Sequence, residues 1–255
     1  MKTAFPISNC QLPIGTPEQS DQSEARSIGN RQLAIGNRAF TLIELLVVLA
    51  VIAVMAALTF PAIQGAKRSM LRARVKSEML GLQMVIESYK DKLGHYPPDN
   101  RMNNPDPYAL NQLYYELLGT TNSAGMFETL DGSAQIPAAS LTAVFGANVT
   151  GFMNSARARS GDEIPTGIAF IKGLRPNQFL AITTPSCTVM GTSLAGPLMY
   201  DGPNGAKINP WRYNVSSPRY NTKTFDLWMD VMVGEKTNRV CNWSDKPIVV
   251  STPYQ

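Results

Sequence analysis

Histidine is almost absent from this sequence of 255 residues, in which His95 is the only one. Zinc sites built from clustered histidines are therefore excluded, and a Ser/His/Asp catalytic arrangement would rest entirely on this residue. Residues 191–196 have the glycine spacing of a phosphate loop, but Pro197 stands where that loop requires a lysine. The sequence offers no catalytic constellation, which predicts that the protein is not an enzyme.

Charged residues are also scarce, at 16% of the chain, and the formal net charge is +4. The basic residues form no long block, and no stripe of alternating aromatic and basic residues accompanies them. We therefore expect no nucleic-acid partner.

Cysteine occurs three times, at Cys10, Cys187 and Cys241. If the segment before residue 40 is removed, an even pair remains. One hypothesis is a Cys187–Cys241 disulfide, which would close a loop of about 55 residues and stabilise the fold by roughly 4 kcal/mol on a chain-entropy estimate. The alternative is a pair of buried, reduced thiols.

Residues 1–39 are polar, poor in aromatic residues and without hydrophobic periodicity, so they cannot form a core of their own. Ala39, a small residue, lies directly before an apolar run, with Arg38 preceding it. In a secretory signal the cut follows the apolar core. A cut after Ala39 would instead leave the apolar run on the mature protein, so residues 1–39 are predicted to be a cleaved leader.

The apolar run at residues 40–62 is predicted to be a transmembrane helix. Residues 45–66 contain no charged side chain and would form a helix about 33 Å long, enough to cross a bilayer. A buried helix of a soluble core is the alternative, but it would not explain the basic residues that flank the run.

Glu44 is an acid near the start of this span, where an ionised side chain costs about 2.5 kcal/mol or more. A cut after Ala39 would create a free amino group at Phe40 that could pair with Glu44, within one chain or between two copies. Alternatively, Glu44 extends to the nearby membrane interface.

Residues 39–48, AFTLIELLVV, resemble the processing and methylation signature of type IV pilins and type II secretion pseudopilins. The resemblance implies cleavage by a prepilin peptidase before Phe40, methylation of the new amino group, and a role for Glu44 in assembly. It also places Pro61 at a position where the family has a proline. Ala39 departs from the pattern, because the family has glycine before the cut.

Residues 63–95 are predicted to continue as an amphipathic stalk helix. Apolar residues recur there at steps of three and four, the spacing of one helical face: Leu71, Val75, Met79, Leu82, Ile86, Tyr89 and Leu93. Pro61 should bend the helix or melt it locally. Gly94 and the two prolines at residues 97–98 should end it.

Residues 96–255 are predicted to form a globular region with a short helix at residues 108–118 and an irregular insertion at about residues 99–165. The strand candidates are short and bounded by glycine and proline: residues 168–171, 178–183, 211–215, 224–229 and 248–251. Their spacing favours an antiparallel sheet packed against the stalk. The predicted fold class is α+β, with a long N-terminal helix on a small C-terminal sheet domain, which is pilin-like.

Residues 209–213 and 225–228 resemble two blocks in the sheet of the major pseudopilins. In that family a nearby loop carries a calcium site. The corresponding residues here include too few oxygen ligands to form such a calcium site, so no cofactor is assigned. Asp226, Asp230 and Asp245 stay candidates for meeting a cation such as calcium.

The resemblance implies a structural subunit of a type II secretion pseudopilus or type IV pilus-like filament, assembled through its hydrophobic N-terminal helix. Implied partners are a prepilin peptidase/methyltransferase, other copies of the chain, minor pseudopilins, and an inner-membrane platform with a cytoplasmic ATPase. Membrane lipid would surround the helix before assembly. The implied location is the bacterial inner membrane, single-pass, with the C-terminal region in the periplasm. The alternative is a membrane-anchored binding domain that never polymerises.

Overall fold

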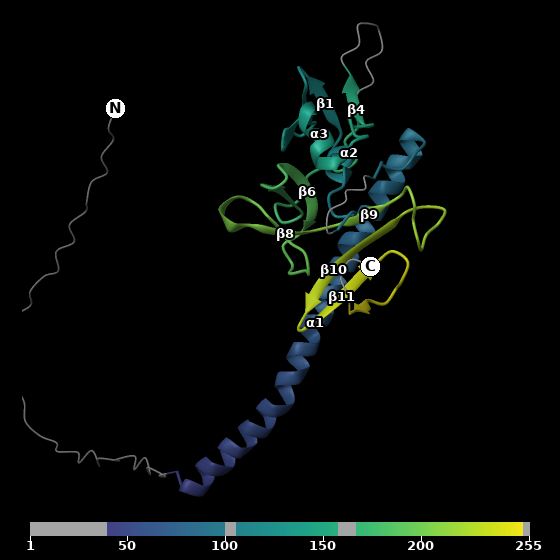
Figure 1. Ribbon diagram of the computed structural model, residues 1–255. Helices are drawn as coiled ribbons and strands as arrows, with labels where there is room; N and C mark the ends of the chain where they lie inside the picture. Colours follow the sequence, from purple (N-terminus) through teal and green to yellow (C-terminus); the bar gives the residue numbers. More distant parts are fainter. Residues whose placement is uncertain (1–39, 100–105, 158–166, 252–255) are drawn as a thin grey trace, which may run out of the picture. The chain divides into compact units, whose positions relative to one another are not determined.

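The computed structural model of the protein describes residues 40–99, 106–157 and 167–251 (Figure 1). The chain divides into two units, Met1–Ile52 and Ala53–Gln255. One helix, α1 (Leu42–Leu93), contains the boundary between them. The described part of the first unit is the start of this helix.

The backbone of α1 stays helical through residue 61, so of the two effects expected of Pro61, a bend or local melting, local melting is not observed. A proline in a helix interior removes one N–H at a cost of about 3 kcal/mol, and a helix of 52 residues keeps its other hydrogen bonds on either side of it. The end of the helix is as predicted: Gly94 adopts φ +80°, and its N–H donates to Lys90 O at 2.8 Å. This conformation is the one that favours glycine after a helix.

In the part of the chain that the structure describes, the remaining elements form three small sheets, two short α-helices and one 3₁₀ turn. In chain order they are α2 (Leu113–Leu118), β1 (Thr120–Ser123), β2 (Met126–Thr129), β3 (Gln135–Pro137), α3 (Ala138–Phe145), β4 (Ser155–Arg157), β5 (Phe179–Ile182), β6 (Cys187–Thr192), β7 (Tyr200–Asp201), the 3₁₀ turn η1 (Pro203–Gly205), β8 (Lys207–Pro210), β9 (Arg212–Asn214), β10 (Asp226–Val233), β11 (Lys236–Cys241) and β12 (Ile248–Val250).

The sheet orders are β3-β2-β1-β4, β5-β6-β8-β7 and β12-β11-β10-β9. Every pairing is antiparallel except that of β1 with β4. The α+β class is confirmed. Strands β8 and β9 are separated only by Trp211, so one extended stretch passes from the second sheet to the third.

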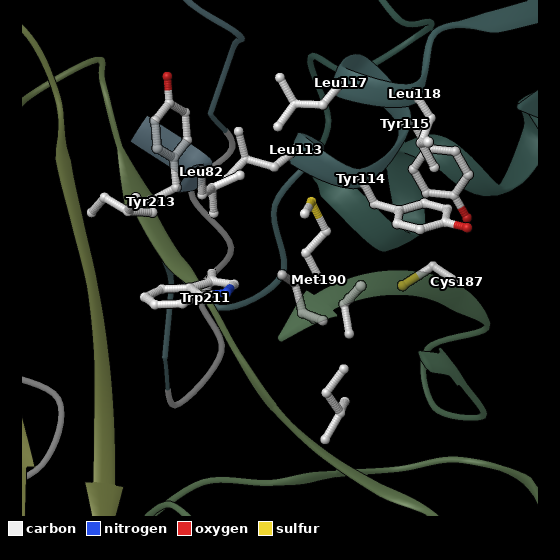
Figure 2. Close-up of a cluster of buried hydrophobic side chains, with 14 of the residues drawn as sticks. Leu82, Leu113, Tyr114, Tyr115, Leu117, Leu118, Cys187, Met190, Trp211 and Tyr213 are labelled. Carbon is white, nitrogen blue, oxygen red and sulfur yellow. The ribbon is translucent and has the colours of Figure 1, made fainter. Parts of the chain in front are cut away.

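A single apolar core joins the stalk part of α1 to the sheets. Val75, Met79, Ile86 and Tyr89 are fully buried on one face of α1, as their spacing predicts. Figure 2 shows side chains from α1, α2, β6 and the β8–β9 stretch gathered in this core. The stalk is thereby fixed to the globular region by packing.

Within the irregular insertion expected at about residues 99–165, residues 120–157 form regular elements, namely α3 and β1 to β4. Large apolar groups are few there, but the aromatic ones are buried, and Tyr115 stacks on Phe152 with ring centroids 4.7 Å apart. Because the average hydrophobicity of this segment is low, its sequence did not indicate the buried aromatic cluster. Residues 100–105 and 158–166 lie outside the described residues.

Two further expectations are corrected by side-chain and backbone hydrogen bonds. The helix predicted from residue 108 begins at Leu113, because the Asn111 side chain donates to Trp211 O at 2.7 Å and accepts from the Leu113 N–H. Residues 168–171 are not a strand. The N–H groups of Phe170 and Ile171 donate to Leu117 O, at 2.9 and 3.2 Å, and so cap the end of α2.

Candidate functional site

The first turn of α1 is closed by a reciprocal pair, Thr41 and Glu44. Glu44 Oε2 accepts hydrogen bonds from both Thr41 N and Thr41 Oγ1, at 2.9 Å each. In return, Thr41 Oγ1 accepts the Glu44 N–H at 3.2 Å. This is a capping box, which supplies partners to N–H groups that the helix itself leaves unsatisfied. The acid therefore has a structural role at the helix end.

The helix that follows is apolar and exposed. Leu42–Thr59 is long and apolar enough to cross a membrane, with a mean hydropathy of 2.8, and none of it is buried within the chain. Phe40 is 79% exposed and Leu42 is 82% exposed. So much unburied apolar surface requires a non-aqueous environment, either lipid or other protein.

A second exposed face continues along the stalk part of α1, on the side of the helix opposite Val75 and Met79. The residues on this face are all exposed and all uncharged, at steps of three and four: Ile63, Ala66, Met70, Ala73, Ser77, Leu80, Met84 and Ser88. Met70 is 74% exposed and Met84 is 70% exposed. We call this set the outer stripe. A solvated helix face is normally charged, so the outer stripe is a candidate contact surface.

A buried carboxyl group fixes the distal end of the stalk to the neighbouring elements. Glu116 of α2 is fully buried. It accepts hydrogen bonds from Tyr89 Oη at 2.8 Å, Met153 N at 2.7 Å and Asn154 N at 2.9 Å. Burial raises the pKa of Glu116, against these hydrogen bonds, which lower it. The network joins α1, α2 and the segment before β4.

The hypothesis of a Cys187–Cys241 disulfide is contradicted by the structure, in which both residues are free, buried thiols. Cys187 is the first residue of β6 and Cys241 is the last residue of β11. These two strands belong to different sheets, so strand pairing does not bring the two cysteines together. Burial raises the pKa of the Cys187 thiol to about 12, which makes it unreactive. The alternative of two reduced thiols is the one observed.

The three candidate cation ligands do not converge. Asp230 forms a two-pronged ion pair with Arg239, at 2.8 and 2.9 Å, and Asp226 accepts the N–H groups of residues 219–221. Asp245 is exposed. Within residues 40–99, 106–157 and 167–251, no group of three or more His, Cys, Asp or Glu side chains is placed to hold a metal ion.

The structure describes only some of the other predicted site residues. Ala39 lies outside the described residues, so the cleavage junction is seen only from Phe40 onward. His95 is exposed at the end of α1, where its ring meets Tyr89 edge-on with centroids 5.6 Å apart. It serves as a packing residue beside the buried carboxyl network.

Thr41 is the site residue that reasoning from the sequence missed. The signal was present, since a threonine followed three residues later by glutamate, just before an apolar run, is the pattern of a capping box. The outer stripe was not predicted from the sequence, for a different reason. Its members are small and polar as well as apolar, so only their exposure in the folded chain separates them from the buried face.

Comparison with known proteins supports this description of the N-terminal segment. Residues 36–60 match the family described as prokaryotic N-terminal methylation motif. A curated relative, type II secretion system core protein G of Escherichia coli (strain K12), is 34% identical over 64 residues. That match covers 25% of this chain and 44% of the relative. No solved structure matches the chain.

The two matches confirm the resemblance to type IV pilin-like and pseudopilin chains. The likeness covers only part of the chain, and the chain spans less than half of the curated relative that it matches. The function of the whole chain is therefore argued below from its own residues.

Proposed function

We propose that the protein is a subunit of a type II secretion pseudopilus or a type IV pilus-like filament, anchored in a membrane before assembly. The observation that carries this proposal is the apolar surface of α1. The span at Leu42–Thr59 is unburied, and the outer stripe extends uncharged surface along the stalk. A membrane anchor alone would need only the span.

Assembly would replace lipid around this helix with other copies of the chain. A helix–helix contact needs apolar or small residues at steps of three and four, and the outer stripe has this spacing. Small residues such as Ala73 and Ser77 let two helix backbones approach closely. Other copies of the chain and minor pseudopilins are the proposed partners. The proposed source of energy for filament assembly is an inner-membrane platform with a cytoplasmic ATPase.

The proposed processing is cleavage between Ala39 and Phe40 by a prepilin peptidase, followed by methylation of the new amino group. This requires the C-terminal region to be on the periplasmic side and the leader in the cytoplasm. The motif match at residues 36–60 supports the proposal by including both residues of the junction. Mass spectrometry of the mature N-terminus tests it: a methylated Phe40 is expected, and an intact Met1 would reject it.

Glu44 has two separable roles, since it closes the capping box and carries a charge. Glu44→Gln keeps an acceptor for the Thr41 N–H, because glutamine also closes a capping box, but it removes the charge. Thr41→Val removes the hydroxyl and keeps the charge. If assembly depends on pairing between Glu44 and the Phe40 amino group of a neighbour, the first change abolishes filaments and the second only weakens them.

The measurement is the amount of sheared filament recovered from cells that express each variant at equal level, with cleavage checked in parallel. Normal filaments from Glu44→Gln would contradict the charge-pairing mechanism. No filaments from the wild-type chain, despite complete cleavage, would favour the alternative of an anchored binding domain that does not polymerise.

A further inference from the structure

Five basic residues follow the membrane span on α1, and they form a set that assembly does not explain. Residues 45–77 contain no acidic side chain, so nothing on this stretch of the helix neutralises them. We call them the basic collar: Lys67, Arg68, Arg72, Arg74 and Lys76.

Two members of the basic collar have partners inside the chain. Arg74 pairs with Glu78 at 3.1 Å, and Lys76 Nζ donates to the carbonyl oxygens of Cys241 and Ser244, at 3.2 and 3.0 Å. Lys67, Arg68 and Arg72 form no ion pair with any residue that the structure describes. Three charges of the collar are thus available to a ligand.

A hollow of about 290 Å³ lies between α1 and the end of β11. Ser69, Arg72 and Lys76 line it on the helix side, and Ser244 and Asp245 line it on the other. Asp245 is exposed and is followed by Lys246, so one acid faces an excess of basic groups. The hollow is large enough for a phosphate group and its neighbouring atoms.

Arg72 Nε is a buried donor at this hollow, and within the described ranges it has no hydrogen-bond partner. A buried donor without a partner costs about 1–3 kcal/mol. An acceptor oxygen from outside the chain would remove that cost. Phosphate oxygens form strong, charge-assisted hydrogen bonds with guanidinium groups.

The position of the basic collar along α1 matches the headgroup layer of a bilayer that the helix would cross. The uncharged residues 45–66 are about 33 Å long as a helix, slightly more than the roughly 30 Å of bilayer hydrocarbon. Lys67 then lies at the edge of the hydrocarbon, and Arg72 lies about 8 Å beyond it. Headgroup phosphates occupy this layer, in the leaflet on the side of the globular region.

We propose that the basic collar and the hollow beside Arg72 bind the phosphodiester of an anionic phospholipid headgroup while the protein is in the membrane. The bound lipid holds the globular region at the bilayer surface. This inference rests on the membrane-anchored state of the proposed function, and it does not depend on filament assembly.

Native mass spectrometry of the full chain in detergent tests the proposal. Phosphatidylglycerol and phosphatidylcholine are added in equal amounts, and retained lipids are counted. We expect the wild-type chain to retain phosphatidylglycerol about tenfold more than phosphatidylcholine, and Arg68→Gln with Arg72→Gln to abolish the preference. The matched control, Lys92→Gln with Lys172→Gln, removes two exposed charges elsewhere in the chain and should keep it.

Equal retention of the two lipids by the wild-type chain would overturn the proposal, as would an equal loss of preference in the control. Displacement of the lipid by millimolar inorganic phosphate would assign the hollow to free phosphate instead. If the double variant does not fold, salt decides the question: 0.5 M NaCl should remove the wild-type preference. Glu44→Gln should retain the lipid preference even where filaments fail, which separates this result from a failure of the proposed function.

Discussion

At the scale of single residues, Glu44 shows how an acid can be kept at the edge of a membrane span. Its carboxylate binds the Thr41 N–H and hydroxyl, so part of the loss of water is offset inside the first helical turn. A charge elsewhere in the span would lack these donors. The acid is therefore positioned before any neighbouring copy arrives.

Glu116 is the other acid whose environment leads to a measurable prediction. Its pKa is raised above the ordinary value of 4.5 because it is buried. A carboxyl with a raised pKa binds its proton more tightly in the folded chain than in the unfolded one. Its contribution to stability is thus complete below pH 4.5 and declines as the pH rises from 4.5 toward the raised value.

We expect Glu116→Gln to flatten this decline, which denaturant unfolding between pH 4 and pH 8 would measure. The variant should also be less stable at every pH, since its amide places N–H groups against the donors of Asn154 or Tyr89. Parallel curves for the two chains would show that Glu116 does not titrate in this range.

At the scale of elements, α1 has two faces with different partners. Val75, Met79 and Ile86 face the chain's own core, whereas Met70 and Met84 face outward. The buried face determines the stability of the subunit. The outer stripe determines, on the proposal above, how subunits meet.

A pair of alanine substitutions separates the two faces. Ile86→Ala should lower the free energy of unfolding by about 2–5 kcal/mol, because a fully buried side chain leaves a cavity. Met84→Ala should change it by less than about 0.5 kcal/mol, since Met84 is 70% exposed, yet it should reduce filament yield. Thermal unfolding and filament recovery check the two outcomes. Normal filament yield from Met84→Lys would remove the outer stripe from the assembly surface.

Strands β6 and β8 approach each other so closely that glycine is needed at one position. A Cβ on Gly191 would lie 2.3 Å from the backbone oxygen of Asn209, a contact that no side-chain rotation can relieve. Gly191→Ala should therefore destabilise the chain by more than about 2 kcal/mol, measured by denaturant unfolding. Gly81→Ala is the control: its Cβ would meet nothing within 4 Å, and it should stabilise α1 by about 1 kcal/mol.

At the scale of the whole molecule, one apolar core packs the sheets against α1 without a covalent cross-link in the described residues, and buried polar contacts add to it. The ion pairs Arg212–Asp106 and Arg239–Asp230 are both buried, and Asn209 Nδ2 donates to Asp230 O at 2.7 Å between β8 and β10. Of these contacts, the Asn209 hydrogen bond joins two sheets, whereas Arg239–Asp230 joins neighbouring strands of one sheet and Arg212–Asp106 joins β9 to the segment before α2. Removing one partner of either ion pair would be costly, because it leaves an unpaired buried charge.

Reducing agents should consequently leave the stability of the native protein unchanged. A denatured, processed chain should show two free thiols, and an uncleaved chain three, since Cys10 lies in the leader. In the native chain, Cys187 should react slowly with iodoacetamide near neutral pH, because its pKa is raised to about 12. Mass spectrometry after alkylation provides the count, and a lower melting temperature in dithiothreitol would contradict the free-thiol structure.

The long helix could be predicted from the sequence because its signals are local. The apolar run, the stalk spacing and the stop at Gly94 each depend on neighbours within a few residues. Four of the five expected strands overlap observed ones, namely β5, β9, β10 and β12. The missed elements, such as β6 and β11, contain Thr, Cys, Asn and Arg at positions that become buried only when the sheets pair.

The sequence by itself determined the apolar span, the acid near its start, the basic collar after it and the motif around Phe40, because each depends on residue type and spacing along one helix. Only the tertiary structure decided that Cys187 and Cys241 are free, buried thiols, that Asp230 pairs with Arg239, and that Met84 faces outward while Ile86 is buried. Those outcomes depend on which distant strands pack together, and pairing between segments far apart in the chain leaves no local pattern.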